Sequence, residues 1–190
     1  MNIVVIADDD SLIGSVEPGS VDLLISLGDL YDGAIQRAID RYRPIKTFAV
    51  RGNHDSDGPF PAGVTDLHLS IQTFEGVRFG GFCGSWRYKP RGHHLFDQTE
   101  VTTMMRRFPA VDVFVAHNSP FGVHQRDSNV HQGFEGFGDY ISRAKPRLFL
   151  HGHQHLDCTT VQGDTTIVGV YGERIVRLEK PGEGAEGNPP

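Results

Sequence analysis

The sequence predicts a mixed α/β domain with two β-sheets and helices on the outside. Short apolar runs recur along the chain, and polar residues follow each of them, which is typical of buried strands that end in loops. In the first half a helical stretch alternates with these runs, as in βαβ units. Further along, segments of alternating apolar and polar residues are separated by tight-turn residues, which favours antiparallel strands.

The length and composition favour a single globular domain. The chain has 190 residues, of which 38% are hydrophobic and 22% charged, and no apolar run approaches the roughly 20 residues of a membrane span. We expect the domain to cover residues 1–180 and the Gly-, Glu- and Pro-rich residues 181–190 to form a disordered tail.

The location and the partners follow from the same numbers. The first predicted strand begins at residue 3, which leaves no room for a signal peptide, and two cysteines outside any metal-binding pair suit the cytoplasm. The formal charge of -6 argues against broad contact with nucleic acid. We therefore expect a cytoplasmic protein that is neither in a membrane nor on nucleic acid.

The strands are predicted from apolar runs and from alternation. Glu75 and Gly76 fit a tight turn between two of them, and Gln162 to Asp164 join the last two. The predicted strands are residues 3–6, 23–25, 47–50, 67–73, 77–82, 111–116, 148–150, 159–161 and 165–170.

Three helices are predicted from apolar residues at helical spacing. The first covers residues 34–42 and is stopped by Pro44. The second begins at Asp97, which with Glu100 fits a capping box. The third covers residues 137–144 and ends before Pro146.

Polar side chains that can bind a metal follow five of the predicted strands. In open α/β sheets, ligands bind beyond the carboxyl ends of the strands, so these side chains would meet at one rim. Carboxylate, amide and imidazole groups together are what a two-metal site needs. The residues are Asp8, Asp10, Asp29, Asn53, His54, His117, His153 and His155.

The order of these clusters resembles the motifs of the calcineurin-like metallophosphoesterase superfamily, in particular its small bacterial and archaeal phosphoesterases. The blocks read Asp8-Asp9-Asp10, Gly28-Asp29, Gly52-Asn53-His54-Asp55, His117 and Gly152-His153-Gln154-His155. The resemblance runs from residue 8 to residue 155. It implies a four-layer αββα sandwich, made of two mixed β-sheets flanked by helices.

The resemblance also implies two divalent metal ions, a hydroxide that bridges them, and a ligand set for each ion. Asp29 is the candidate for the bridging carboxylate, because its two oxygens can each bind one ion. Asp8, Asp10, Asp29 and His155 would hold one ion. Asn53, His117 and His153 would hold the other together with Asp29.

His54 follows a ligand directly, so we expect it to act as a general acid rather than as a metal ligand. An acid of this kind needs a carboxylate to fix its tautomer and favour its protonated form. Asp32 resembles the second Asp of the family's Gly-Asp-x-x-Asp motif, and Asp55 is the neighbouring rival. We favour Asp32.

Asp10 departs from the family pattern, which has His at this position. An Asp can still ligate, but its harder oxygen suits manganese or iron better than zinc, which remains the alternative. The alternative consequence of Asp in place of His is that the ion held by Asp8, Asp10, Asp29 and His155 is lost.

Two later segments are candidates for contact with the substrate. Residues 85–94 interleave aromatic and cationic side chains, which could stack a base and hold a phosphate, and from them we predict substrate contacts by Arg87 and Arg91. A surface loop with Trp86 packed inward is the alternative. His131 lies in a His-x-Gly sequence that resembles the small phosphoesterases, and we expect it to reach the substrate.

The function predicted from the sequence is a metal-dependent phosphoesterase that hydrolyses small phosphodiesters or nucleotides. A phosphomonoesterase, including a protein phosphatase, is the closest alternative. A non-catalytic scaffold with the same fold is the alternative from another class, and the presence of His54 argues against it. The substrate's identity, the metal and the oligomeric state do not follow from the sequence.

Overall fold

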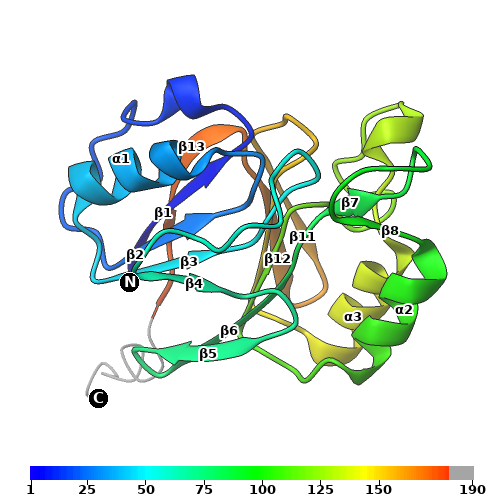
Figure 1. Cartoon of the computed structure of the whole chain (residues 1–190). Helices are drawn as coiled ribbons and strands as arrows, with labels where there is room; N and C mark the ends of the chain where they lie inside the picture. The colour runs from blue at the N-terminus through cyan, green and yellow to red at the C-terminus, as the bar shows by residue number, and fades with distance from the viewer. Residues whose placement is uncertain (180–190) are drawn as a thin grey trace, which may run out of the picture.

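The computed structural model describes residues 1–179, and its centre is made of two sheets that pack face to face (Figure 1). The predicted disordered tail, residues 181–190, lies outside the described residues. None of the helices within residues 1–179 has the length and apolar character that a membrane span requires.

The first sheet is built mainly from the N-terminal part of the chain. Its central strands run parallel, and one antiparallel strand closes the edge beside β1. In spatial order the strands are β13 (Gly172–Arg177), β1 (Asn2–Ala7), β2 (Leu23–Ser26), β3 (Lys46–Ala49) and β4 (Val64–Asp66).

The second sheet has a parallel centre and an antiparallel strand at each edge. In spatial order its strands are β11 (Cys158–Gln162), β12 (Thr165–Gly169), β10 (Leu148–His151), β9 (Val113–Ala116), β6 (Val77–Phe82) and β5 (Ile71–Phe74). A separate short pair, β7 (Ser85–Trp86) and β8 (Leu95–Phe96), lies within the loop that follows β6.

The three predicted helices are confirmed, and their ends have local causes. α1 (Asp32–Tyr42) and α3 (Glu135–Ala144) each end at a residue in the left-handed conformation, directly before a proline. α2 (Gln98–Arg107) starts with the predicted capping box between Asp97 and Glu100. Two 3-10 turns that the sequence did not predict, η1 (Asp10–Leu12) and η2 (Asn129–His131), lie in the loops after β1 and β9.

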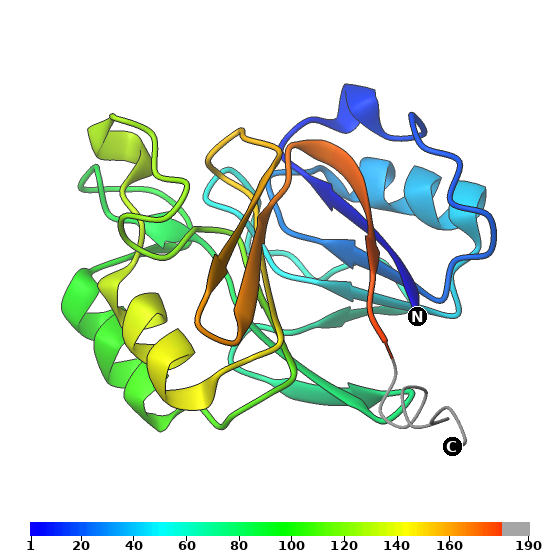
Figure 2. The same cartoon turned by 180° about the vertical axis from the view of Figure 1, so that it is seen from behind.

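The buried apolar residues form three layers of core, which confirms the four-layer αββα sandwich. The central core lies between the sheets and joins Ile25 and Phe48 of the first sheet to Phe79 and Val115 of the second. A second core packs α1 on the outer face of the first sheet. A third core, rich in phenylalanine, packs α2 and α3 on the outer face of the second sheet (Figures 1 and 2).

One strand prediction was partly wrong and one strand was missed. Of the predicted strand at residues 67–73, only residues 71–73 lie in a strand, β5, whereas residues 67–70 connect β4 of the first sheet to β5 of the second. Asp66 accepts a hydrogen bond from the backbone N–H of His68, and Leu69 has φ 50°, so the chain turns between β4 and β5. The sequence analysis also missed the edge strand β13, because its charged residues break the apolar pattern of a strand. One of them, Glu173, is nevertheless buried, and its carboxylate accepts hydrogen bonds from the backbone N–H groups of residues 14–16.

Candidate metal centre

The candidate metal ligands lie where β1, β2, β3, β9 and β10 end, at the edge shared by both sheets. Four of them adopt the left-handed conformation, which is unfavourable for residues other than glycine by roughly 1–2 kcal/mol. Asp8, Asp29, His153 and His155 have φ of 63°, 54°, 61° and 50°. Strain of this kind, held by the surrounding structure, is typical of functional sites.

Two motif glycines allow the loops to approach the carboxylates closely. A Cβ on Gly52 would lie 2.1 Å from Asp29 Oδ1, and a Cβ on Gly152 would lie 2.8 Å from Asp8 Oδ2. Any side chain at either position would therefore push a candidate ligand out of place. The glycines of the Gly-Asn-His and Gly-His-x-His motifs thus serve the packing of the site.

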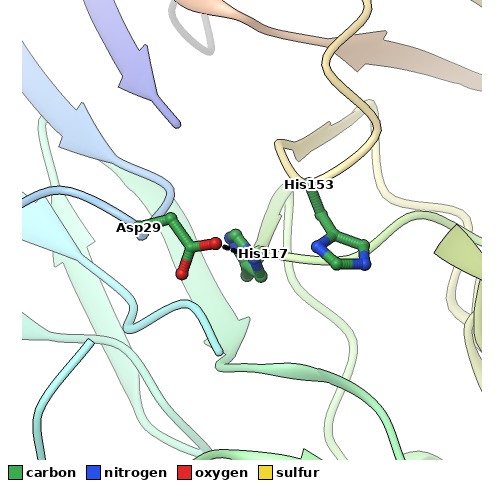
Figure 3. A group of neighbouring side chains, drawn as sticks. All are labelled: Asp29, His117 and His153. Carbon is green, nitrogen blue, oxygen red and sulfur yellow. Dashed lines mark ion pairs between the residues drawn. The ribbon is translucent and has the colours of Figure 1, made fainter. Parts of the chain in front are cut away.

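His117 is the fully buried centre of the cluster. Its Nδ1–H donates to the Leu27 carbonyl over 2.8 Å, which turns Nε2 toward the other candidate ligands. Nε2 lies 3.1 Å from Asn53 Oδ1 and 3.4 Å from Asp29 Oδ2. Figure 3 shows Asp29 and His117 side by side, with the His153 ring beyond them.

His153 approaches from the loop after β10. Its Nε2 lies 3.1 Å from the Val130 carbonyl, so Nε2 carries the hydrogen and Nδ1 is left for a cation. Asp29, His117 and His153 offer ligand atoms within 4.8 Å of one another. The Asp29 oxygen and the Asn53 amide from the first sheet, with the two imidazole nitrogens from the second, therefore suit a single divalent ion.

Asp8 supplies a carboxylate whose bonding is incomplete. Oδ2 accepts a hydrogen bond of 2.9 Å from the backbone N–H of His153, whereas the buried Oδ1 has no hydrogen-bond partner among the described residues. A buried acceptor without a donor is costly unless it binds a cation. The orphaned oxygen and the donor set beside it fit the two-metal site that the resemblance implies.

The charges of the cluster are strongly coupled. Burial, together with the Asp29 carboxylate, raises the pKa of Asp8 to about 7. Burial disfavours the protonated form of His117 as well, but the attraction of the Asp29 carboxylate exceeds this effect and raises the pKa of His117 to about 9. Burial lowers the pKa of His153 to about 3. The positive charge that the carboxylates require thus resides on His117, where a bound cation would replace the proton.

Two predicted ligands stand apart from this group. His155 is exposed, and its ring lies 5.7 Å from the His131 ring and 5.2 Å from the Tyr171 ring. Asp10 begins η1 and lies 3.4 Å from Arg37 Nη2, with 42% of its side chain exposed. Ligation by these two residues remains a prediction.

His54 is exposed and lies beside the cluster, since its backbone N–H donates to Asp29 Oδ1 over 2.7 Å. The two carboxylates considered as its partner have other bonds in this structure. Asp32 pairs with Arg51 over 2.8 Å. Asp55 accepts from the backbone N–H groups of Asp29, Leu30 and Gly52, and so ties the loops after β2 and β3 together.

Only one of the predicted substrate contacts lies against the cluster. The His131 ring is 5.2 Å from the His153 ring. Arg87 lies 3.2 Å from Asp97 and 3.7 Å from Glu100, at the start of α2. Arg91 is exposed in the same loop. Substrate contact by these three residues remains a prediction.

Sequence reasoning missed two residues at the site. Tyr88 has its hydroxyl 3.5 Å from Asn53 Nδ2. Gln154, the variable residue of Gly-His-x-His, is fully buried and donates to Asn118, Ser119 and the His131 carbonyl. The aromatic character of residues 85–94 pointed to the Tyr88 loop, but no local signal marks Gln154.

The fold and site together define a class of protein, a two-sheet mixed α/β domain with a carboxylate and imidazole cluster at the shared strand ends. The chain belongs to the calcineurin-like phosphoesterase family, whose model matches residues 6–157. A comparison with curated proteins found no match.

Solved structures share the fold at low sequence identity. TT1561 of Thermus thermophilus is 13% identical with a TM-score of 0.57, covering 90% of this chain and 89% of its own. Phosphopantetheinyl hydrolase of Mycobacterium tuberculosis is 15% identical with a TM-score of 0.53, covering 90% and 89%. A putative 5'-nucleotidase of Staphylococcus aureus is 13% identical with a TM-score of 0.51, covering 94% of this chain and 51% of its own.

Proposed function

We propose that this chain is a metal-dependent phosphoesterase that hydrolyses small phosphodiesters or nucleotides. The observation that carries the proposal is the convergence of Asp29, Asn53, His117 and His153 beside Asp8, whose buried Oδ1 has no hydrogen-bond partner among the described residues. Two divalent cations, manganese or iron with zinc as the alternative, would be held by these residues together with Asp10 and His155. When bound, such cations polarise phosphoryl oxygens and lower the pKa of water.

The residues of the chain have separate tasks in this proposal. Hydrolysis adds water across a P–O bond: the water oxygen bonds to phosphorus, and the leaving oxygen takes the electron pair of the broken bond. His54 donates its proton to that oxygen and regains one from solvent, and the one proton that the attacking water loses passes to solvent. Asp32 supports the protonated form of His54, and His131, Arg87 and Arg91 contact the substrate.

Two of the structural relatives support a small phosphoester substrate, because one is named a phosphopantetheinyl hydrolase and another a putative 5'-nucleotidase. The formal charge of -6 disfavours a nucleic-acid polymer as the substrate.

A panel of chromogenic phosphate monoesters and diesters, assayed with manganese, iron and zinc, tests the proposal. We expect turnover of a diester with manganese, loss of turnover with a chelator, and recovery when manganese is restored. The matched variant is Asp29→Asn, which keeps the size of the side chain but removes the candidate bridging charge.

The alternatives predict different results in the same assay. Turnover of monoesters alone would make the chain a phosphomonoesterase. No turnover with any metal, while the protein still binds manganese, would leave the non-catalytic scaffold as the function.

A further inference from the structure

A pocket of about 360 Å³ lies beside the metal centre on the side of His54. Asp29 and His54 belong to its lining, so the pocket borders the cluster. Its lining is Asp29, Leu30, Tyr31, Asp32, Arg51, His54, Asp55 and Ser56. Pockets of roughly this size and above commonly hold small organic ligands.

The lining of this pocket includes the aromatic residue Tyr31. Tyr31 directly precedes α1 and is 57% exposed, which is unusual for a large aromatic side chain. The Arg37 guanidinium lies 5.1 Å from the centre of the Tyr31 ring and also donates to the Tyr31 hydroxyl. These contacts hold the ring in place in the lining of the pocket.

The charges of the pocket are already matched within the protein. Arg51 pairs with Asp32, and the Asp55 carboxylate is occupied by three backbone N–H groups. Arg51 is therefore not free to bind an anion, while the Asp32 side chain remains 46% exposed. A ligand with a second phosphate or a carboxylate would find no free cation in Arg51 and would face the exposed part of the Asp32 carboxylate, which disfavours it.

A hydrogen-bond donor in the pocket lining lacks an acceptor. The Arg51 side chain is only 7% exposed, and its Nε is buried with no hydrogen-bond partner among the described residues. The other side of this guanidinium lies 3.8 Å from the centre of the Phe60 ring. The pocket thus combines an aromatic face, a partly exposed carboxylate and an unpaired buried donor.

We propose that this pocket is the leaving-group subsite, and that it takes a neutral alcohol carrying a planar, polar ring, the chemical class of a nucleoside. The ring would stack on Tyr31, its N–H and O–H groups would donate to Asp32, and its hydroxyl would lie beside His54. The substrate would then be a nucleotide ester that releases a nucleoside. This inference rests on the proposed function for its catalytic meaning, but the binding itself is measured without turnover.

Adenosine is the probe, and calorimetry of the full chain, with and without manganese, is the measurement. We expect adenosine to bind, and Tyr31→Ala to weaken its binding at least about fivefold, as loss of one aromatic stack does. Tyr31→Phe keeps the ring and should stay within about twofold of the native affinity. Tyr31→Leu keeps apolar bulk without a ring and should weaken binding as Tyr31→Ala does.

Phe121→Ala is the matched control, because Phe121 is 49% exposed and does not line this pocket. Its affinity for adenosine should equal that of the native protein. Failure of adenosine to bind, or equal binding by all three Tyr31 variants, would overturn the subsite. Tyr31-dependent binding of adenosine without any esterase turnover would support the subsite and refute the proposed function. Esterase turnover without Tyr31-dependent binding would support the proposed function and refute the subsite.

Discussion

Asp8 shows at the scale of one residue what the candidate site costs in stability. Its carboxylate is buried with one oxygen unpaired, and its pKa is raised to about 7 by burial. A carboxyl whose folded pKa is raised destabilises the fold once it ionises. The cost begins above the ordinary pKa of 3.8 and is complete above about pH 7.

Asp8→Asn should therefore stabilise the metal-free protein at pH 8, by about 1–3 kcal/mol, because it removes the buried charge. The amide keeps an oxygen that can accept from the His153 N–H. Urea unfolding with a chelator, at pH 8 and at pH 4, measures the effect. The two proteins should converge at pH 4, and a variant less stable than the native protein at pH 8 would contradict this account.

His54→Ala should retain both metal ions but lose roughly 10²–10⁴-fold in rate on an ester with a poor leaving group, because the leaving oxygen then lacks a proton donor. A nitrophenolate leaving group needs less protonation, so the loss should be much smaller there. Rates on the two kinds of ester, with metal content measured in parallel, decide the role. Equal losses on both would assign His54 to substrate positioning instead.

Asp10→Ala tests the departure from the family pattern. If Asp10 ligates, calorimetry should show the affinity for one of the two ions falling at least about tenfold. Arg37→Ala is the control, because it removes the 3.4 Å ion pair but leaves the carboxylate, and it should keep both ions. Unchanged metal binding by Asp10→Ala would make Asp10 a surface residue paired with Arg37.

At the scale of elements, the loops after the strands determine the site more than the strands do. Gly52 touches Asp29 so closely that Gly52→Ala should destabilise the fold by about 1–3 kcal/mol and displace the candidate bridging carboxylate. Gly58→Ala, in the same connection, is the matched control, since its Cβ would meet nothing closer than 3.5 Å. Urea unfolding and metal affinity of both variants give the answer, and equal effects would remove the special role of Gly52.

The elements also show what a single sequence can reveal. The strands β1, β2, β9 and β10 were predicted correctly because their residues are buried on both faces and form continuous apolar runs. β13 was missed because Glu173 breaks its apolar pattern, and the backbone N–H that Glu173 accepts from belongs to Gly14, 159 positions away. The sequence around a strand does not indicate such a distant partner.

The site divides in the same way. Residues that follow buried strands, such as Asp29 and His117, were predicted from position and type, and the structure brings them within ligand distance. Tyr88 and Gln154 reach the site through loops, whose path depends on tertiary contacts. Sequence alone could not place them.

At the scale of the whole molecule, the candidate centre joins the two sheets. Asp29 and Asn53 follow strands of the first sheet, whereas His117 and His153 follow strands of the second. Manganese should therefore raise the free energy of unfolding, by about 2.7 kcal/mol when the free metal is 100 times its dissociation constant. Thermal unfolding with manganese and with a chelator measures this gain in stability. The gain should be much smaller for Asp29→Asn. If manganese does not stabilise the native protein, a metal that spans the sheets is contradicted.

The position of β13 has a consequence for synthesis on the ribosome. Asn2 pairs with Arg177, so one edge of β1 stays unpaired until β13, near the end of the domain, has been translated. Until then the nascent chain presents an open, apolar strand edge of the kind that invites mispairing with other chains. The domain thus completes its first sheet last, and chaperones that shield nascent strands would act on β1 throughout elongation.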